Sequence, residues 1–170
     1  MSKAPFVYKK FFQRLCDIFH QETFTKIRGE RCKLRTYAIF KKEPGLEQYL
    51  SEIKNLHMRI NVTKFRLSNH KLMIETGRIK KIENAEERFC PFCPESVENE
   101  FHFLFSCQTY HPLRSDYLTP ITSQVHGFFF WTDNQKLEYI MSCMEQNTCK
   151  FISNCLDIRE FLINNPKRHQ

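Results

Sequence analysis

Four potential metal ligands within eighteen residues constrain this chain more than any other feature of its sequence. Cys90 and Cys93 are followed by His102 and Cys107, which gives the pattern Cys-x2-Cys-x8-His-x4-Cys. Two thiolates two residues apart can bind the same ion because the intervening Pro-Phe dipeptide turns the backbone, and a later His and Cys can complete a tetrahedron. The pattern therefore predicts a zinc site, with Zn²⁺ as the cofactor.

The identity of the fourth ligand stays open, because His111 lies four residues past Cys107 and could replace His102. Ser96 is a suitable N-cap for a helix over residues 97–105. On that helix, His102 and Cys107 would point about 140° apart if the helix were straight. We therefore expect Cys107 at the end of this helix or just past it.

The fold class predicted by the sequence is mainly α, a helical domain with a small zinc-stapled lobe made of a knuckle and a helix. Only four glycines occur in 170 residues, and no regular strand alternation is bounded by Asn-Gly or Asp-Gly turns. The length suits one core with a small stapled lobe. We expect a basic helical segment over 1–87, the knuckle and helix over 88–114, and C-terminal helices over 115–170 that pack on the same core.

Apolar spacing and helix-stop residues outline the remaining helices. An amphipathic helix is expected over 5–20, a short one over 33–42, a break near Gly77, and two closing helices over 134–144 and 150–162. The run Gly127–Trp131 is the most apolar in the chain. Aromatic side chains can stack on nucleic-acid bases, but three consecutive phenylalanines cannot share one face, so we expect most of them in the core.

The cysteine usage indicates a reducing compartment. The first twenty residues contain several charges and no apolar signal segment, and no apolar run approaches the roughly 20 residues of a membrane span. We therefore expect a soluble intracellular protein, nuclear or cytoplasmic, without membrane contact. The cysteines outside the metal pattern are predicted to be small core residues: Cys16, Cys32, Cys143, Cys149 and Cys155.

Positive charge is concentrated in the first half of the chain. Residues 1–89 contain 20 Lys and Arg against 10 Asp and Glu, whereas residues 90–170 contain 6 against 9. Because phosphate contacts use Lys and Arg, a polyanion is expected to contact the N-terminal half. The predicted nucleic-acid-binding residues are Arg59, Lys64, Arg66, Arg78 and Lys80.

Two of these arginines have a structural alternative. Helical spacing from residue 53 onward predicts two apolar stripes, with Arg59 and Arg66 in a basic seam between them. A pair with a core-edge carboxylate such as Glu75 is as compatible with this position as a phosphate contact. The stripes are Ile53, Leu56, Ile60 and Leu67 on one side, and Met58, Val62 and Phe65 on the other.

Several short runs resemble the C-terminal region of non-LTR retrotransposon (LINE-type) reverse transcriptases, with its Cys-Cys-His-Cys zinc knuckle. The resemblance covers about residues 33–114. The run Val97–Leu104, followed by Cys107, Tyr110 and Arg114, is its most specific part. The other matching runs are 33–37, 40–41, 49–50, Arg59, 64–70 and 74–78.

The resemblance implies a region downstream of the polymerase that helps to hold template RNA and target DNA during target-primed reverse transcription. The chain contains no Tyr-x-Asp-Asp pair of metal-binding carboxylates and has no room for a polymerase or an endonuclease. The expected function is therefore that of a nucleic-acid-binding C-terminal fragment without catalytic activity of its own. The alternative is a zinc-stapled helical protein-interaction module whose acidic C-terminal half docks a partner.

Overall fold

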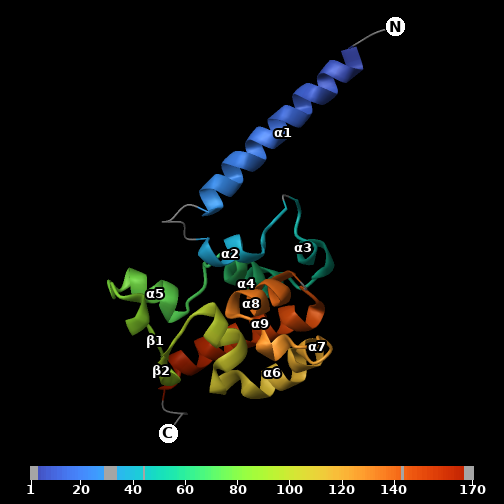
Figure 1. The fold of residues 1–170 in the computed structure, drawn as a ribbon. Helices are drawn as coiled ribbons and strands as arrows, with labels where there is room; N and C mark the ends of the chain where they lie inside the picture. The colour runs from blue at the N-terminus through green and yellow to red at the C-terminus, as the bar shows by residue number, and fades with distance from the viewer. Residues whose placement is uncertain (1–3, 29–33, 44, 143, 167–170) are drawn as a thin grey trace.

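The fold is built around two helices that lie side by side, α4 (Leu56–Arg66) and α9 (Gln146–Asn164) (Figure 1). Asn55 starts α4 by accepting a hydrogen bond from the backbone of Met58 at 3.0 Å. Val62 and Phe65 are completely buried, as are the apolar residues of α9 that face them. Asn61 ties the two helices together because its amide donates to the Ser153 hydroxyl at 3.1 Å.

This computed structural model describes residues 4–28, 34–43, 45–142 and 144–166. The described residues are mainly helical, which confirms the mainly α fold class, while the zinc-stapled lobe stays a prediction. The other α-helices are α1 (Ala4–Arg28), α2 (Arg35–Phe40), α3 (Tyr49–Glu52), α5 (Met73–Ile79), α6 (His111–Tyr117), α7 (Thr119–Thr122) and α8 (Asp133–Ser142). The remaining elements are the 3-10 turns η1 (Ala85–Glu87), η3 (Gln108–Tyr110) and η4 (Phe128–Phe130), the π-helix η2 (His102–Ser106), and the strands β1 (Phe89–Cys90) and β2 (Cys93–Val97).

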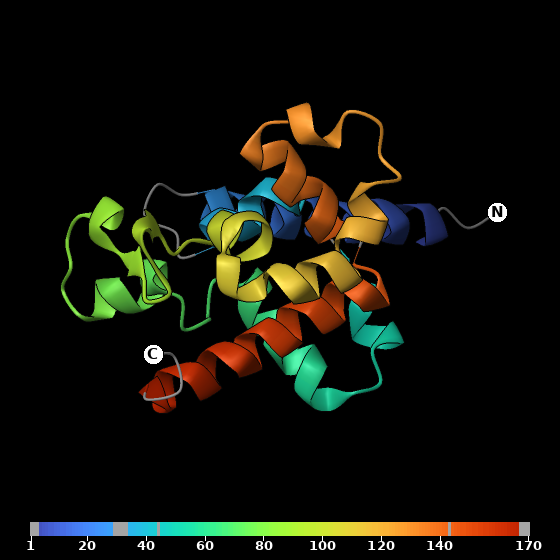
Figure 2. The ribbon, with the colours of Figure 1, turned by 90° about the horizontal axis from the view of Figure 1, so that it is seen from below.

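Around the central pair, α2 and α8 pack together on one side, and α6 with α7 covers another part of α9 (Figure 2). The β-hairpin and α5 lie at one end of the body (Figures 1 and 2). The core that joins these elements runs from Phe40 in α2 to Cys155 in α9 and includes Cys90 and Cys107. The predicted metal ligands therefore lie at the edge of the main core.

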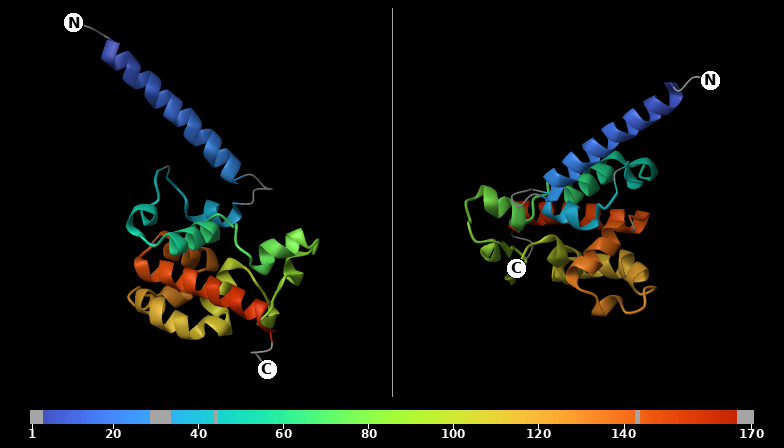
Figure 3. Two further views of the ribbon diagram at one scale, coloured as in Figure 1. Left: turned by 180° about the vertical axis from the view of Figure 1, so that it is seen from behind. Right: turned by 45° about the horizontal axis from the view of Figure 1, so that its top comes forward.

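Helix α1 projects from the body as a long rod (Figures 1 and 3). The amphipathic helix predicted over 5–20 is present and continues to Arg28. Its apolar side chains are nevertheless exposed: Phe11, Phe12, Leu15, Ile18 and Phe19. Cys16 on this helix is only half-buried, so its predicted place in the core is wrong.

Helix α4 is buried on one side, not on the two sides that its apolar stripes predicted. Leu56 and Ile60 keep 60% and 42% of their surface exposed, whereas the opposite stripe is in the core. Ser68 adopts a positive φ of 50° and ends the helical path before His70. His70 therefore enters the structure from the α4–α5 link and not from the helix.

Two further predictions need correction. Gly77 does not mark a break, because it lies inside α5 and is buried. Phe128 is buried, but Phe129 and Phe130 remain 76% and 94% exposed, so most of this aromatic run is outside the core. The 3-10 turn η4 points successive side chains in different directions, which is why only one of the three is covered.

Other predictions are confirmed where the structure describes them. Cys149 and Cys155 are buried in the core, and the two closing helices correspond to α8 and α9. The short helix predicted over 33–42 is observed as α2, while Cys32, Lys33 and Cys143 lie outside the described residues. None of the helices in the described part of the chain combines the length and the apolar character that a membrane crossing requires.

Candidate metal centre

The hairpin places the first two cysteines opposite each other. Strands β1 and β2 pair antiparallel, with Cys90 opposite Cys93 across the Pro-Phe turn. The Phe92 ring at this turn packs edge-on against Tyr110, with ring centroids 6.4 Å apart. Packing of the turn on a buried tyrosine fixes the direction in which the two thiols point.

The π-helix η2 brings the other two ligands to the same place. The backbone N–H of Cys107 donates to the carbonyl of His102 at 2.8 Å, so the turn closes over five residues instead of four. This wider turn brings residue i+5 back beneath residue i, which an ordinary α-helix would not do. Cys107 directly follows η2, which confirms its expected place just past the end of the helix, but the last turn of that helix is a π-helix and not an α-helix.

The start of this segment also differs from the prediction. Ser96 lies within β2, not at a helix cap. Asn99 caps the segment instead, because its side-chain oxygen accepts a hydrogen bond from the His102 backbone N–H at 2.8 Å. This bond caps the helical turn that begins at Glu100 and leads directly into η2 at His102.

The structure brings the ligand atoms of Cys90, Cys93, His102 and Cys107 together, all within 4.8 Å of one another. The Cys93 and Cys107 sulfur atoms are 3.9 Å apart. A tetrahedral ion with metal–sulfur bonds of roughly 2.3 Å separates its sulfur ligands by about 3.8 Å, so the spacing fits. Three of these residues are buried and Cys93 is half-buried. This group could hold a metal ion.

His111, the rival fourth ligand, is not part of this group. It is the first residue of α6, and its side chain is exposed. The His102 imidazole, in contrast, is buried, and its Nε2 atom has no hydrogen-bond partner among the described residues. A buried nitrogen without a partner is costly, and a metal ion would remove this cost.

The environment of the cluster favours the thiolate form of Cys107, whereas the hydrogen bond to Cys107 and burial raise the pKa of Cys90. The Cys90 thiol donates a hydrogen bond to Cys107, which is the largest cause of a Cys107 pKa lowered to about 4; burial opposes this effect, and His102 adds to it. The guanidinium of Arg114 lies beside the same segment and donates to the Leu104 and Cys107 carbonyls at 2.6 and 3.0 Å. A cation at this position stabilises negative charge on the sulfur atoms.

A buried ion pair anchors the centre to α9. Glu98 is only 1% exposed, and both of its carboxylate oxygens accept hydrogen bonds from Arg159 at 2.7 Å. One of them also accepts from the Met73 backbone N–H at 2.6 Å. Glu98, which directly follows β2, therefore links this strand to α5 and α9.

Glu100 forms a second buried polar anchor. Its Oε1 atom accepts hydrogen bonds from the Thr36 hydroxyl at 2.8 Å and from His70 Nε2 at 3.0 Å. His70 Nδ1 accepts from the Leu72 backbone N–H at 3.4 Å, so Nε2 carries the proton. Glu98 and Glu100, which follow the Cys-x2-Cys pair in the sequence, are thus buried and bind partners in the core. The sequence alone did not reveal these partners.

Arg88 links the hairpin to α5. Its guanidinium donates to the carbonyls of Ile74 and Ile82, each at 2.8 Å. A Cβ atom at Gly77 would lie only 2.6 Å from the Arg88 side chain. Glycine at this position therefore permits the close approach of Arg88, which is the reason for a glycine inside the helix.

Two of the predicted nucleic-acid-binding residues, Arg59 and Arg66, form hydrogen bonds within the protein. Arg66 is 2% exposed, and it donates to Glu47 Oε2 at 2.7 Å and to the Met141 carbonyl. Arg59 is half-buried and donates to the Leu50 and Ile53 carbonyls at the end of α3. The assignment of Arg66 to the basic surface is corrected, because its buried guanidinium cannot leave its partners without exposing unpaired polar groups. Arg59 keeps part of its surface accessible, so its assignment stays a prediction.

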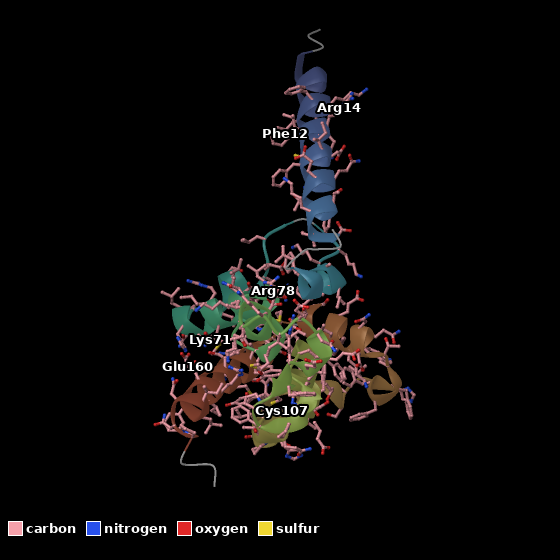
Figure 4. All side chains as sticks on the ribbon, turned by 90° about the vertical axis from the view of Figure 1, so that its left-hand side faces the viewer. Phe12, Arg14, Lys71, Arg78, Cys107 and Glu160 are labelled. Atoms are coloured by element: carbon pink, nitrogen blue, oxygen red, sulfur yellow. The ribbon has the colours of Figure 1, made fainter. Side chains whose placement is uncertain are left out.

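The other three predicted residues, Lys64, Arg78 and Lys80, are exposed. The carboxylate of Glu75 pairs with Arg78 at 3.1 Å, and not with Arg59 or Arg66. Arg78 projects on the side of the body where the Lys71–Glu160 ion pair also lies (Figure 4). The structure thus keeps three of the five candidate cations on the surface.

Comparison with known proteins adds no relative: no family model matches the chain, and no curated protein or solved structure is detectably similar to it.

Proposed function

We propose that Cys90, Cys93, His102 and Cys107 hold one zinc ion as a structural site. Three thiolates and one imidazole at tetrahedral spacing are the ligands that zinc prefers. Four protein ligands leave no open position for a water molecule, so the ion would staple the hairpin to η2 and would not generate a hydroxide nucleophile.

We further propose that the chain binds nucleic acid through the α1–α5 side of the molecule. The observation that carries this proposal is the segregation of exposed charge. Among the described residues, eleven Lys and Arg are exposed, all of them before residue 82, and they outnumber the seven Asp and Glu that are exposed before residue 90. Between residues 90 and 166, the described Lys and Arg are buried or half-buried, while six Asp and Glu are exposed. This uneven distribution of charge suits a molecule whose basic N-terminal half faces phosphates.

The resemblance to the C-terminal region of non-LTR retrotransposon reverse transcriptases supports the same function. In that setting the chain would hold template RNA or target DNA beside a polymerase that another part of the element supplies. The chain alone would neither polymerise nor cut nucleic acid. Its buried carboxylates are committed to Arg159, His70 and Arg78, and do not converge on a pair of cations.

A salt titration tests the binding proposal. Affinity of the purified chain for RNA and for duplex DNA should fall steeply with salt, and Lys64→Gln with Lys80→Gln should flatten the log–log slope by about 0.7 to 0.9 for each phosphate that the variant no longer neutralises. Lys150→Gln is the matched control, because it removes a cation from the C-terminal half. Equal slopes for the wild type, the double variant and the control would reject the α1–α5 surface.

The second candidate function is a protein-interaction module, and the six exposed acidic residues after residue 89 favour it. A basic partner would then dock on the C-terminal half. The same titration separates the two functions, because an interaction module would bind neither RNA nor duplex DNA at low salt.

A further inference from the structure

A pocket of about 250 Å³ lies between the π-helix, the α6–α7 pair and α8. Aromatic rings form its walls: Phe101 and Phe105 have ring centroids 5.0 Å apart, and the Phe105 and Phe128 centroids are 6.0 Å apart. The pocket is smaller than the 300–1,000 Å³ typical of drug-sized ligands. Its size suits one planar ring system.

The charge of the pocket is positive. Its lining includes Arg114 and Lys136, and none of the described residues that line it carries a carboxylate. Arg114 is committed to the backbone carbonyls of the metal-bearing segment. Lys136 of α8 lies over the Phe101 ring, with its Nζ atom 6.0 Å from the centroid. An amine above an aromatic wall can reach an anion bound at the rim.

Phe129 supplies an exposed aromatic face at the same pocket. Its ring is 76% exposed although it lines the pocket, and it packs edge-on against the buried Phe128 at 6.1 Å. An exposed aromatic ring that continues the wall of an aromatic pocket offers apolar surface that a planar ligand could cover.

We propose that this pocket takes one unstacked base of a single-stranded nucleic acid, which stacks on Phe129 while Lys136 contacts the neighbouring phosphate. Aromatic stacking combined with a nearby cation is the general chemistry of single-strand binding. The inference rests on the proposed nucleic-acid function and adds a base contact to it. It is separate from the α1–α5 surface, which would contact only phosphates.

The structure contains a built-in reporter for this pocket. Trp131, the only tryptophan of the chain, packs on Phe128 with ring centroids 5.5 Å apart. A base bound against Phe128 and Phe129 would change the environment of the indole. Its fluorescence should therefore report on the pocket and not on distant phosphate contacts.

The experiment titrates the full chain with a twelve-residue single-stranded oligothymidylate and with an abasic oligomer of equal length and charge. We expect Trp131 quenching by the first and not by the second. Phe129→Leu should weaken binding of the oligothymidylate by about 5- to 100-fold and leave binding of the abasic oligomer unchanged. Phe161→Leu, an exposed phenylalanine on α9 outside the pocket, is the control and should behave as wild type.

The outcomes separate this inference from the function on which it rests. If both oligomers bind equally and Phe129→Leu has no effect, the base site is wrong while phosphate binding stands. If neither oligomer binds at low salt, nucleic-acid binding fails and the base site with it. An apolar peptide is titrated in parallel; if Trp131 responds to the peptide and to neither oligomer, the pocket is a protein-docking site and the inference is wrong.

Discussion

At the scale of single residues, two buried carboxylates hold the fold together through partners that are distant in sequence. Glu98 and Arg159 are 61 positions apart, and Glu100 and His70 are 30 apart. A local pattern cannot reveal such pairs, because side-chain periodicity predicts which face a residue occupies and not which residue faces it. The same limit explains why the sequence leaves Arg66 ambiguous, whereas the structure places Glu47 beside it.

The buried Glu98–Arg159 pair should contribute far more to stability than an exposed pair on the same helix. Arg159→Met leaves a buried carboxylate without its cation, so we expect the free energy of unfolding in urea to fall by about 3–5 kcal/mol. Lys71→Met removes the exposed Lys71–Glu160 pair and should cost less than about 1 kcal/mol. Equal costs for the two variants would contradict the anchoring role of Glu98.

Glu47 should make stability depend on acidic pH. Burial raises the pKa of its carboxyl group, but the hydrogen bond from Lys41 and the charge of Arg66 outweigh burial, so the folded-state pKa is below the ordinary value. A carboxyl group with a lowered folded-state pKa stabilises the fold above its unfolded pKa, and this contribution is lost as pH falls through the folded value.

The test compares the wild type with Glu47→Gln by urea unfolding at several pH values. We expect the variant to be less stable by about 1–3 kcal/mol at pH 7, and the difference to shrink below the ordinary carboxyl pKa. Tyr37 also donates to this carboxylate, at 3.1 Å, and its loss as a partner is included in the measured cost. A difference that stays constant from pH 7 to pH 3 would show that the charge of Glu47 is not involved.

At the scale of elements, the sequence predicted the two closing helices well and the segment with the candidate metal ligands only in part. The positions of α8 and α9 follow from apolar spacing. The π-helix does not, because its apolar pattern resembles that of an α-helix. The five-residue step from His102 to Cys107 was the available signal, since two ligands of one ion cannot point 140° apart.

Removal of the metal should loosen more than the ligand-bearing segment. Residues 88–107 are tied to α5 through Glu98 and Arg88, so hydrogen exchange after treatment with a chelator should increase in the hairpin, in η2 and in α5. Exchange in α1 should not change, because α1 projects away from this end. Exchange that rises only between residues 90 and 107 would contradict the coupling to α5.

At the scale of the whole molecule, composition predicted the asymmetry of charge but not where individual cations point. The excess of Lys and Arg before residue 90 leaves eleven exposed cations there in the described residues, yet Arg59 and Arg66 turn inward. The exposure of the apolar side of α1 could not be predicted from the sequence either. Helical periodicity shows that a helix has an apolar face, but it does not show whether another element covers that face.

The most direct test of the account is metal analysis of the purified chain together with two single variants. We predict one zinc per chain in the wild type, loss of zinc in His102→Ala, and retention in His111→Ala. Circular dichroism should show that both variants keep most of the helical content of the wild type, so that metal loss is not a consequence of global unfolding. Zinc retained by His102→Ala and lost by His111→Ala, or no zinc in the wild type, would contradict the central claim.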